Sequence, residues 1–141
     1  MSRADAIAKL KDVPLFHNCS GRQLRRIAEL GREVNFDPGK NVCEEGKFAD
    51  EFFVIVEGRA EVRAGGRKRG TLGPGDYFGE IALLRSSLID RSRRTATVTA
   101  TEPLRCFRLG ANQFNMVLYE QDVAVKILRE VVRRLDAPSD R

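Results

Sequence analysis

Two short stretches of the chain contain groups that could hold an anion. Gly79 and Glu80 open a short run of helix-forming residues, and Arg94 and Thr95 follow after a polar segment. The first amides of a single helical turn have no partner within the turn, and together with the local dipole they favour a phosphate group. A glycine at this point removes the side chain that would obstruct the phosphate. Residues 78–98 are therefore predicted to form a small phosphate pocket.

The charged residues of this pocket narrow the choice of ligand. The carboxylate of Glu80 would repel a phosphate, but it can accept a hydrogen bond from a ribose 2′-OH. The guanidinium of Arg94 can bind two phosphate oxygens in a fork and also neutralise Glu80, which a lysine does less well. Thr95 adds a hydroxyl group beside it. A carboxylate, a guanidinium and several backbone amides together fit a cyclic nucleotide.

The order of these residues closely resembles the phosphate-binding cassette of the cyclic nucleotide-binding domain family. That family includes protein kinase A regulatory subunits, the catabolite activator protein and cyclic-nucleotide-gated channels. The resemblance implies that Glu80 binds the ribose 2′-OH and that Arg94 binds an equatorial phosphate oxygen. It also implies that the backbone amides of residues 79–82 and of Ala96 lie near the cyclic phosphate. The two matching runs are Phe78-Gly79-Glu80-Ile81-Ala82-Leu83-Leu84 and Arg94-Thr95-Ala96-Thr97-Val98.

The chain departs from the family pattern in one place. Residues 85–93 form a longer segment than the family usually has between the short helix and its arginine. Arg91 and Arg93 are therefore rival candidates for the phosphate arginine, although the Arg-Thr-Ala-Thr-Val order favours Arg94. A degenerate cassette that only makes protein contacts is the alternative to a binding one.

The resemblance also implies contacts to the base of the nucleotide. Val62 matches a position that commonly lines the base pocket, and the last helix matches the lid over the base. The lid candidates on that helix are Val131, Arg134 and Leu135. The complete set of expected ligand contacts is Val62, Phe78, Gly79, Glu80, Ile81, Ala82, Arg94, Thr95, Ala96, Val131, Arg134 and Leu135.

Helices are expected at both ends of the chain. Ser2 and Ser20 can cap two N-terminal helices, which Pro14 and Gly31 would end. Residues 112–118 begin a further helical region, and an apolar stripe at helical spacing continues it to Leu135. In the family, the N-terminal helical pair commonly moves when ligand binds.

Between the helical ends, residues 33–109 show short apolar alternations broken by glycine every several residues. Such spacing is typical of an antiparallel sandwich or barrel. The prediction is one α+β domain over residues 1–141. It comprises N-terminal helices (1–31), an antiparallel eight-stranded, jelly-roll-like β-roll (32–110) that holds the cassette (78–98), and C-terminal helices (111–136). The expected inward residues are Val34, Phe36, Phe52, Val54, Val56, Ala60, Val62, Val98 and Phe107, with residues 52–56 as a central strand.

The composition argues against catalysis and against a metal site. The chain has 141 residues, three cysteines that are far apart, and one histidine, His17. These residues supply neither a set of metal ligands nor an acid–base pair, so we expect a protein that is not an enzyme and binds no metal. No window approaches the about 20 apolar residues of a membrane span, and the N-terminus has no secretory core, so a cytoplasmic location is expected.

The net charge of +5 raises the question of nucleic-acid binding. The basic residues are scattered over several elements, among them residues 67–69, which we expect in a turn. Aromatic residues do not alternate with them as on a stacking platform, so direct nucleic-acid binding is not expected. The expected ligand is cAMP, or less favourably cGMP, and the expected output is a helix rearrangement read by an effector domain or partner. Thr95 resembles a feature of cGMP-selective kinases, but members of the family with Arg-Thr also bind cAMP.

Overall fold

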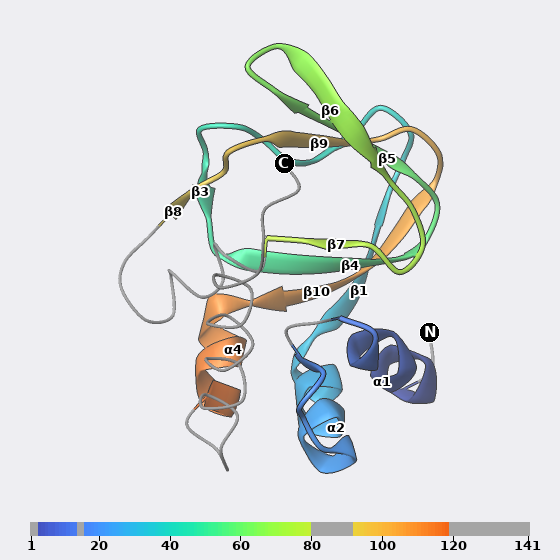
Figure 1. Ribbon diagram of the computed structural model, residues 1–141, viewed down its shortest axis with the longest axis vertical. Coiled ribbons are helices and arrows are strands. Elements are labelled where there is room, and N and C mark those ends of the chain that lie inside the picture. The colour runs from blue at the N-terminus through green and yellow to red at the C-terminus, as the bar shows by residue number, and fades with distance from the viewer. Residues whose placement is uncertain (1–2, 14–15, 80–91, 119–141) are drawn as a thin grey trace, which may run out of the picture.

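Two four-stranded antiparallel sheets form the centre of the computed structural model, which describes residues 3–13, 16–79 and 92–118 (Figure 1). The first sheet contains β1 (Arg32–Phe36), β10 (Leu104–Gly110), β4 (Glu51–Glu57) and β7 (Tyr77–Phe78), in that order. The second contains β2 (Asn41–Cys43), β9 (Thr97–Ala100), β5 (Ala60–Ala64) and β6 (Arg67–Leu72). A separate two-stranded ribbon pairs β3 (Phe48–Ala49) with β8 (Ser92–Arg93). The predicted α+β fold with an eight-stranded antiparallel β-roll is confirmed.

Within the described residues, three helices pack against the first sheet, at one end of the roll (Figure 1). They are α1 (Arg3–Lys11), α2 (Gly21–Leu30) and α4 (Ala111–Leu118). The predicted cap of α2 is present: the Ser20 hydroxyl accepts a hydrogen bond from the Gln23 amide at 3.2 Å, and the Gln23 side chain accepts one from the Ser20 amide at 2.8 Å. Gly31 ends this helix as expected. Ser2, Pro14 and the expected helical stripe beyond residue 118 lie outside the described residues.

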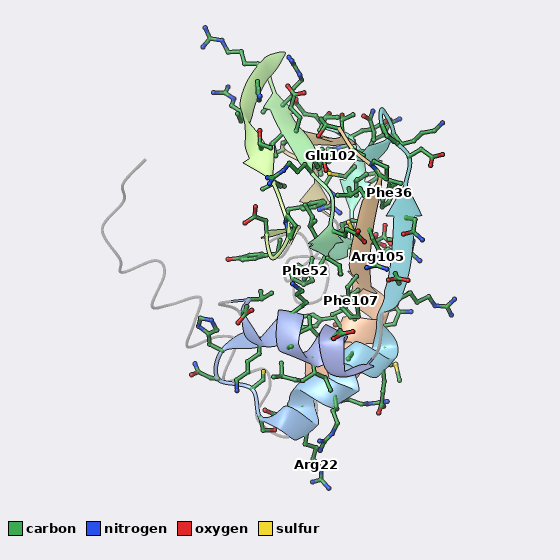
Figure 2. The ribbon with its side chains drawn as sticks, turned by 90° about the vertical axis from the view of Figure 1, so that its right-hand side faces the viewer. Arg22, Phe36, Phe52, Glu102, Arg105 and Phe107 are labelled. Atoms are coloured by element: carbon green, nitrogen blue, oxygen red, sulfur yellow. The ribbon has the colours of Figure 1, made fainter. Side chains whose placement is uncertain are left out.

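The buried apolar residues in the described ranges form two clusters on opposite faces of β4. Phe52 and Val54 pack with the helices, and Phe53 and Ile55 pack between the two sheets. Figure 2 shows Phe52, together with Phe107 of β10, at the boundary between the strands and the helices. As predicted, β4 is a central strand, lying between β10 and β7. Because helices cover one of its faces and a sheet covers the other, the strand is buried on both sides, which the alternation pattern did not indicate.

The other predicted inward residues are also in the core. Ala60, Val98 and Phe107 are buried, and the remaining four are partly buried against the two clusters: Val34, Phe36, Val56 and Val62. The basic residues 67–69 differ from their prediction, because they begin β6, and the turn before them is made by Gly65 and Gly66 with φ of 59° and 75°. No helix in the part of the chain that the structure describes has the length and apolar content of a bilayer crossing.

Cys106 makes the stability of the fold depend on pH. Its side chain is fully buried between the sheets, and burial raises the pKa of the thiol from 9.0 to about 12. A raised pKa stabilises the folded state fully below the unfolded value of 9.0, and this contribution is lost as the pH rises from 9.0 towards about 12. We expect the free energy of unfolding to fall over this range, by at most about 1.4 kcal/mol per pH unit for one proton.

Urea unfolding measured at several pH values between about 8 and 10.5 tests this expectation. Other groups titrate in the same range, so the comparison is with Cys106→Ala, in which the thiol is absent and the pH dependence should be shallower. The cavity that this substitution leaves lowers the stability at every pH and therefore does not change the slope. Equal slopes for the two proteins would contradict the prediction.

Candidate functional site

Arg94 is held by main-chain groups at both its backbone and its guanidinium. Arg94 follows β8, and its amide donates to the Lys47 carbonyl at 2.8 Å, while its own carbonyl accepts from the Gly46 amide at 2.9 Å. The side chain is half-buried, and Nη2 donates to the carbonyl oxygen of Glu51 at 2.7 Å. This bond uses one of the five N–H groups of the guanidinium and sets the direction of its planar fork.

Gly79 lies directly against this guanidinium. Its φ is +87°, and a Cβ atom built on it would lie 2.4 Å from the Glu51 carbonyl oxygen and 2.5 Å from Arg94 Nη1. No side chain fits there, so the close approach requires glycine. The two stretches that the sequence analysis singled out, Phe78-Gly79 and Arg94, therefore meet at the first residue of β4.

Aromatic side chains in the interior of the roll pack beneath the contact between Gly79 and Arg94. Phe78 pairs with Phe53 across β7 and β4, and their rings stack with centroids 5.1 Å apart at an interplanar angle of 18°. The Arg94 guanidinium carbon lies 5.9 Å from the centroid of the Phe53 ring, within cation–π range. Phe78 is thus part of the support beneath Gly79.

The two described arginines of the rival set have different partners. Arg93 is exposed: its Nη1 donates to the Gly46 carbonyl at 2.7 Å, and its guanidinium carbon lies 4.3 Å from the Phe48 ring centroid. Arg94 is the one that contacts Gly79. The third candidate, Arg91, lies outside the described residues.

The remaining site predictions lie at different places. Val62 is on β5 opposite Val98 of β9 and packs against the cluster between the sheets. Thr95 is exposed, and the carbonyl of Ala96 lies 3.8 Å from the Cys43 sulfur. The other six predicted residues lie outside the described part of the chain: Glu80, Ile81, Ala82, Val131, Arg134 and Leu135.

The family model for the cyclic nucleotide-binding domain matches residues 33–121, which include the strands of the roll except the first residue of β1, as well as Gly79 and Arg94. The chain belongs to the cyclic nucleotide-binding domain family. The predicted resemblance is thereby confirmed. The family is named for cyclic nucleotide binding, which agrees with the predicted class of binding domain.

Individual relatives and solved structures agree with this assignment. Over 100 aligned residues, the chain is 39% identical to the cAMP-dependent protein kinase regulatory subunit of Mycosarcoma maydis. The alignment covers 68% of this chain but only 19% of that protein. The N-terminal domain of a transcriptional regulator from Streptomyces coelicolor A3(2) superposes with a TM-score of 0.79 at 29% identity, over 90% of each chain. The cAMP-bound PfPKA-R (141–441) has the same fold, with a TM-score of 0.70 at 23% identity, over 97% of this chain and 48% of that one.

A cavity of about 280 Å³ opens beside Arg94 of this cyclic nucleotide-binding domain. Its walls come from residues 41–44, from Lys47 and Phe48, from Asp50 and Glu51, and from Arg94. Burial raises the pKa of the Cys43 thiol in this wall, and the nearby Arg94 guanidinium partly opposes that shift. The sequence analysis missed this wall because β2 and residues 47–51 have no motif of their own; only strand pairing brings them to Arg94.

Proposed function

We propose that this domain binds a cyclic purine mononucleotide, with cAMP preferred to cGMP. The observation that carries the proposal is the contact of the Arg94 guanidinium with Gly79, inside the region that the family model matches. A guanidinium beside a glycine backbone offers neighbouring N–H donors, and the oxygens of a phosphodiester anion can accept hydrogen bonds from them. The preference for cAMP is supported by a relative named as a cAMP-dependent protein kinase regulatory subunit and by the cAMP-bound PfPKA-R.

In this proposal the phosphate lies between Arg94 and the backbone amides of residues 79–82, with the amide of Ala96 nearby. The hydrogen bond from Arg94 Nη2 to the Glu51 carbonyl leaves other N–H groups of the fork for the phosphate oxygens. Phe78 supports the backbone at Gly79 through its stacking on Phe53. The main recognition of the ligand is thus through its negatively charged cyclic phosphate.

Other elements contact the base of the nucleotide and transmit the binding signal. Val62 of β5 lines the base pocket, Thr95 lies next to the phosphate arginine, and Val131, Arg134 and Leu135 close over the base as a lid. Ligand binding shifts the population of open and closed arrangements of the terminal helices, and an effector domain or partner protein reads that shift. The domain thereby acts as a regulatory module rather than as an enzyme, and it uses no metal.

The substitution Glu80→Gln tests the proposed contact with the ribose. The amide oxygen still accepts a hydrogen bond from the 2′-OH, but the charge is lost, so we expect cAMP binding to weaken by about 1 to 2 kcal/mol. Titration calorimetry measures the change. With 2′-deoxy-cAMP as ligand the same substitution should have little effect, because the donor is absent. Tighter cAMP binding by the variant, or an equal loss with the deoxy ligand, would contradict this role.

The function itself is tested by calorimetry and thermal shift with cAMP and cGMP, using 5′-AMP as the non-cyclic control. We expect heat of binding and a raised melting temperature with the cyclic ligands, cAMP giving the lower Kd, and much weaker effects with 5′-AMP. A ligand that binds only the folded state raises its stability by mass action, so the two measurements should agree. The absence of both effects at millimolar cyclic nucleotide would overturn the proposal and leave a domain that makes only protein contacts.

A further inference from the structure

Glu51 connects the Arg94 guanidinium to strand β10 through two different groups. Its backbone carbonyl accepts the hydrogen bond from Arg94 Nη2 at 2.7 Å. Its side-chain Oε2 lies 3.1 Å from Nε of Arg108, near the end of β10. One residue, the first of β4, therefore contacts two arginines that are far apart in the sequence.

Strand register places these groups on one face of the first sheet. Phe53 of β4 is directly opposite Phe78 on one side and Arg108 on the other, and directly opposite residues project to the same face. Glu51 precedes Phe53 by two residues in the same strand and so shares that face. The guanidinium carbon of Arg94 lies 5.9 Å from the centroid of the Phe53 ring, so the Arg94 side chain is on this face as well.

The ion pair also offsets repulsion between two like charges. Arg32 of β1 is directly opposite Arg108, and like charges in that position repel each other. The carboxylate of Glu51 draws the Arg108 guanidinium towards β4 and compensates part of this repulsion. Arg32 and Arg108, together with Glu51, line a cavity of about 230 Å³ at the junction of β10 and α4.

The segment before β4 is held to the same junction by a second contact. The amide of Ala111, the first residue of α4, donates to the Asp50 carbonyl at 2.8 Å. Glu51 is also directly opposite Gly110 in the β4–β10 pairing, so residues 50 and 51 are held to this junction by strand pairing, by the backbone bond to Ala111 and by the ion pair with Arg108. The position of the Glu51 carbonyl, and with it the orientation of the Arg94 guanidinium, depends on these contacts.

We propose that Arg108 is a positioning residue for cyclic nucleotide binding, which acts through Glu51 on the guanidinium of Arg94. The inference rests on the proposed function, and it extends the site to a residue that is not expected to touch the ligand. Arg108 and Glu51 have side-chain exposures of 39% and 37%, so their pair contributes little to global stability. Its effect is local, because it restricts the strand end to which Arg94 is bonded.

The sign of the effect of Glu51 distinguishes positioning from simple charge effects. If Glu51 acted on the ligand only through its negative charge, Glu51→Met would make the site more positive and tighten binding of the anion. Positioning predicts the opposite: Glu51→Met and Arg108→Met should each weaken cAMP binding, by about two- to fivefold. The double variant should lose no more than the larger single loss, because both substitutions break the same pair.

The experiment is titration calorimetry with cAMP on the full chain and its variants, with urea unfolding as a check of the fold. Arg108→Lys keeps a charged donor and should recover part of the lost affinity. The matched control is Glu57→Met, at the other end of β4, where Glu57 pairs with Arg105 of β10 at 2.9 Å, far along the strand from Arg94. This variant should bind cAMP as the unmodified chain does.

Unchanged or tighter binding by Glu51→Met, additive losses in the double variant, or an equal loss in the Glu57→Met control would overturn the inference. Failure of the unmodified chain to bind cyclic nucleotide would instead overturn the proposed function, and the inference with it. Normal binding by the unmodified chain and weaker binding by Glu51→Met and Arg108→Met only would support both.

Discussion

Replacing Arg94 by alanine is expected to weaken cAMP binding by about 2 to 4 kcal/mol, because a charge-assisted contact with the phosphate is lost. That loss corresponds to a Kd about 30- to 1000-fold higher in titration calorimetry. Arg94→Lys keeps the charge but not the fork, so it should recover only part of the affinity. The alanine variant should stay folded, since the substitution removes a half-buried side chain and leaves the backbone bonds to residues 46 and 47 intact.

Arg93→Ala is the matched control for this prediction. Arg93 adjoins Arg94 in the chain and has the same side chain, but its guanidinium contacts the Gly46 carbonyl and the Phe48 ring instead of Gly79. Its loss should leave cAMP binding nearly unchanged. A large loss in Arg93→Ala or in Arg91→Ala, with Arg94→Ala unaffected, would assign the phosphate to a different arginine.

Gly79→Ala should disrupt the contact with Arg94 from the side of the backbone. The new methyl group would meet the Glu51 carbonyl oxygen at 2.4 Å and Arg94 Nη1 at 2.5 Å, at a φ of +87° that side chains rarely adopt. Strain and overpacking together should lower the free energy of unfolding by about 2 to 4 kcal/mol. Urea unfolding measures this loss. Calorimetry on the folded fraction should show weak cAMP binding as well, because the guanidinium must move away.

Gly39→Ala separates the two causes. Gly39 has nearly the same φ, +88°, but an added Cβ there meets nothing within 4 Å. Its substitution should cost only the backbone strain, about 1 kcal/mol, and leave cAMP binding intact. If the two alanine variants lost the same stability and bound cAMP equally well, the close approach at Gly79 would have no energetic importance.

The sequence alone was enough to predict several local features, and the reason is that their causes are local. The cap of α2 depends on Ser20 and a residue three positions later, and its end depends on Gly31. Glycines at short intervals and alternating apolar residues indicated an antiparallel roll. The two runs that resemble the family cassette indicated Gly79 and Arg94 as partners, although what they bind stays a prediction.

Other features could not be predicted from neighbouring residues. The alternation pattern assigned Phe52 and Val54 to the core but omitted Phe53 and Ile55, because a strand that is covered on both faces has no polar side. The wall of the cavity formed by β2 and residues 47–51 was missed for a related reason. These residues have ordinary types, and their position next to Arg94 arises from the pairing of distant segments.

The sequence by itself determined the class of site: a glycine turn and an arginine whose chemistry suits a sugar phosphate, carried on a β-rich chain with helical ends. Only the tertiary structure decided which described arginine reaches Gly79, and that Glu51 binds Arg94 by its carbonyl and Arg108 by its carboxylate. The physical reason is the range of the interactions involved. Propensities and caps act over a few residues, whereas the strand pairing that brings residues 51, 79, 94 and 108 together depends on the whole roll.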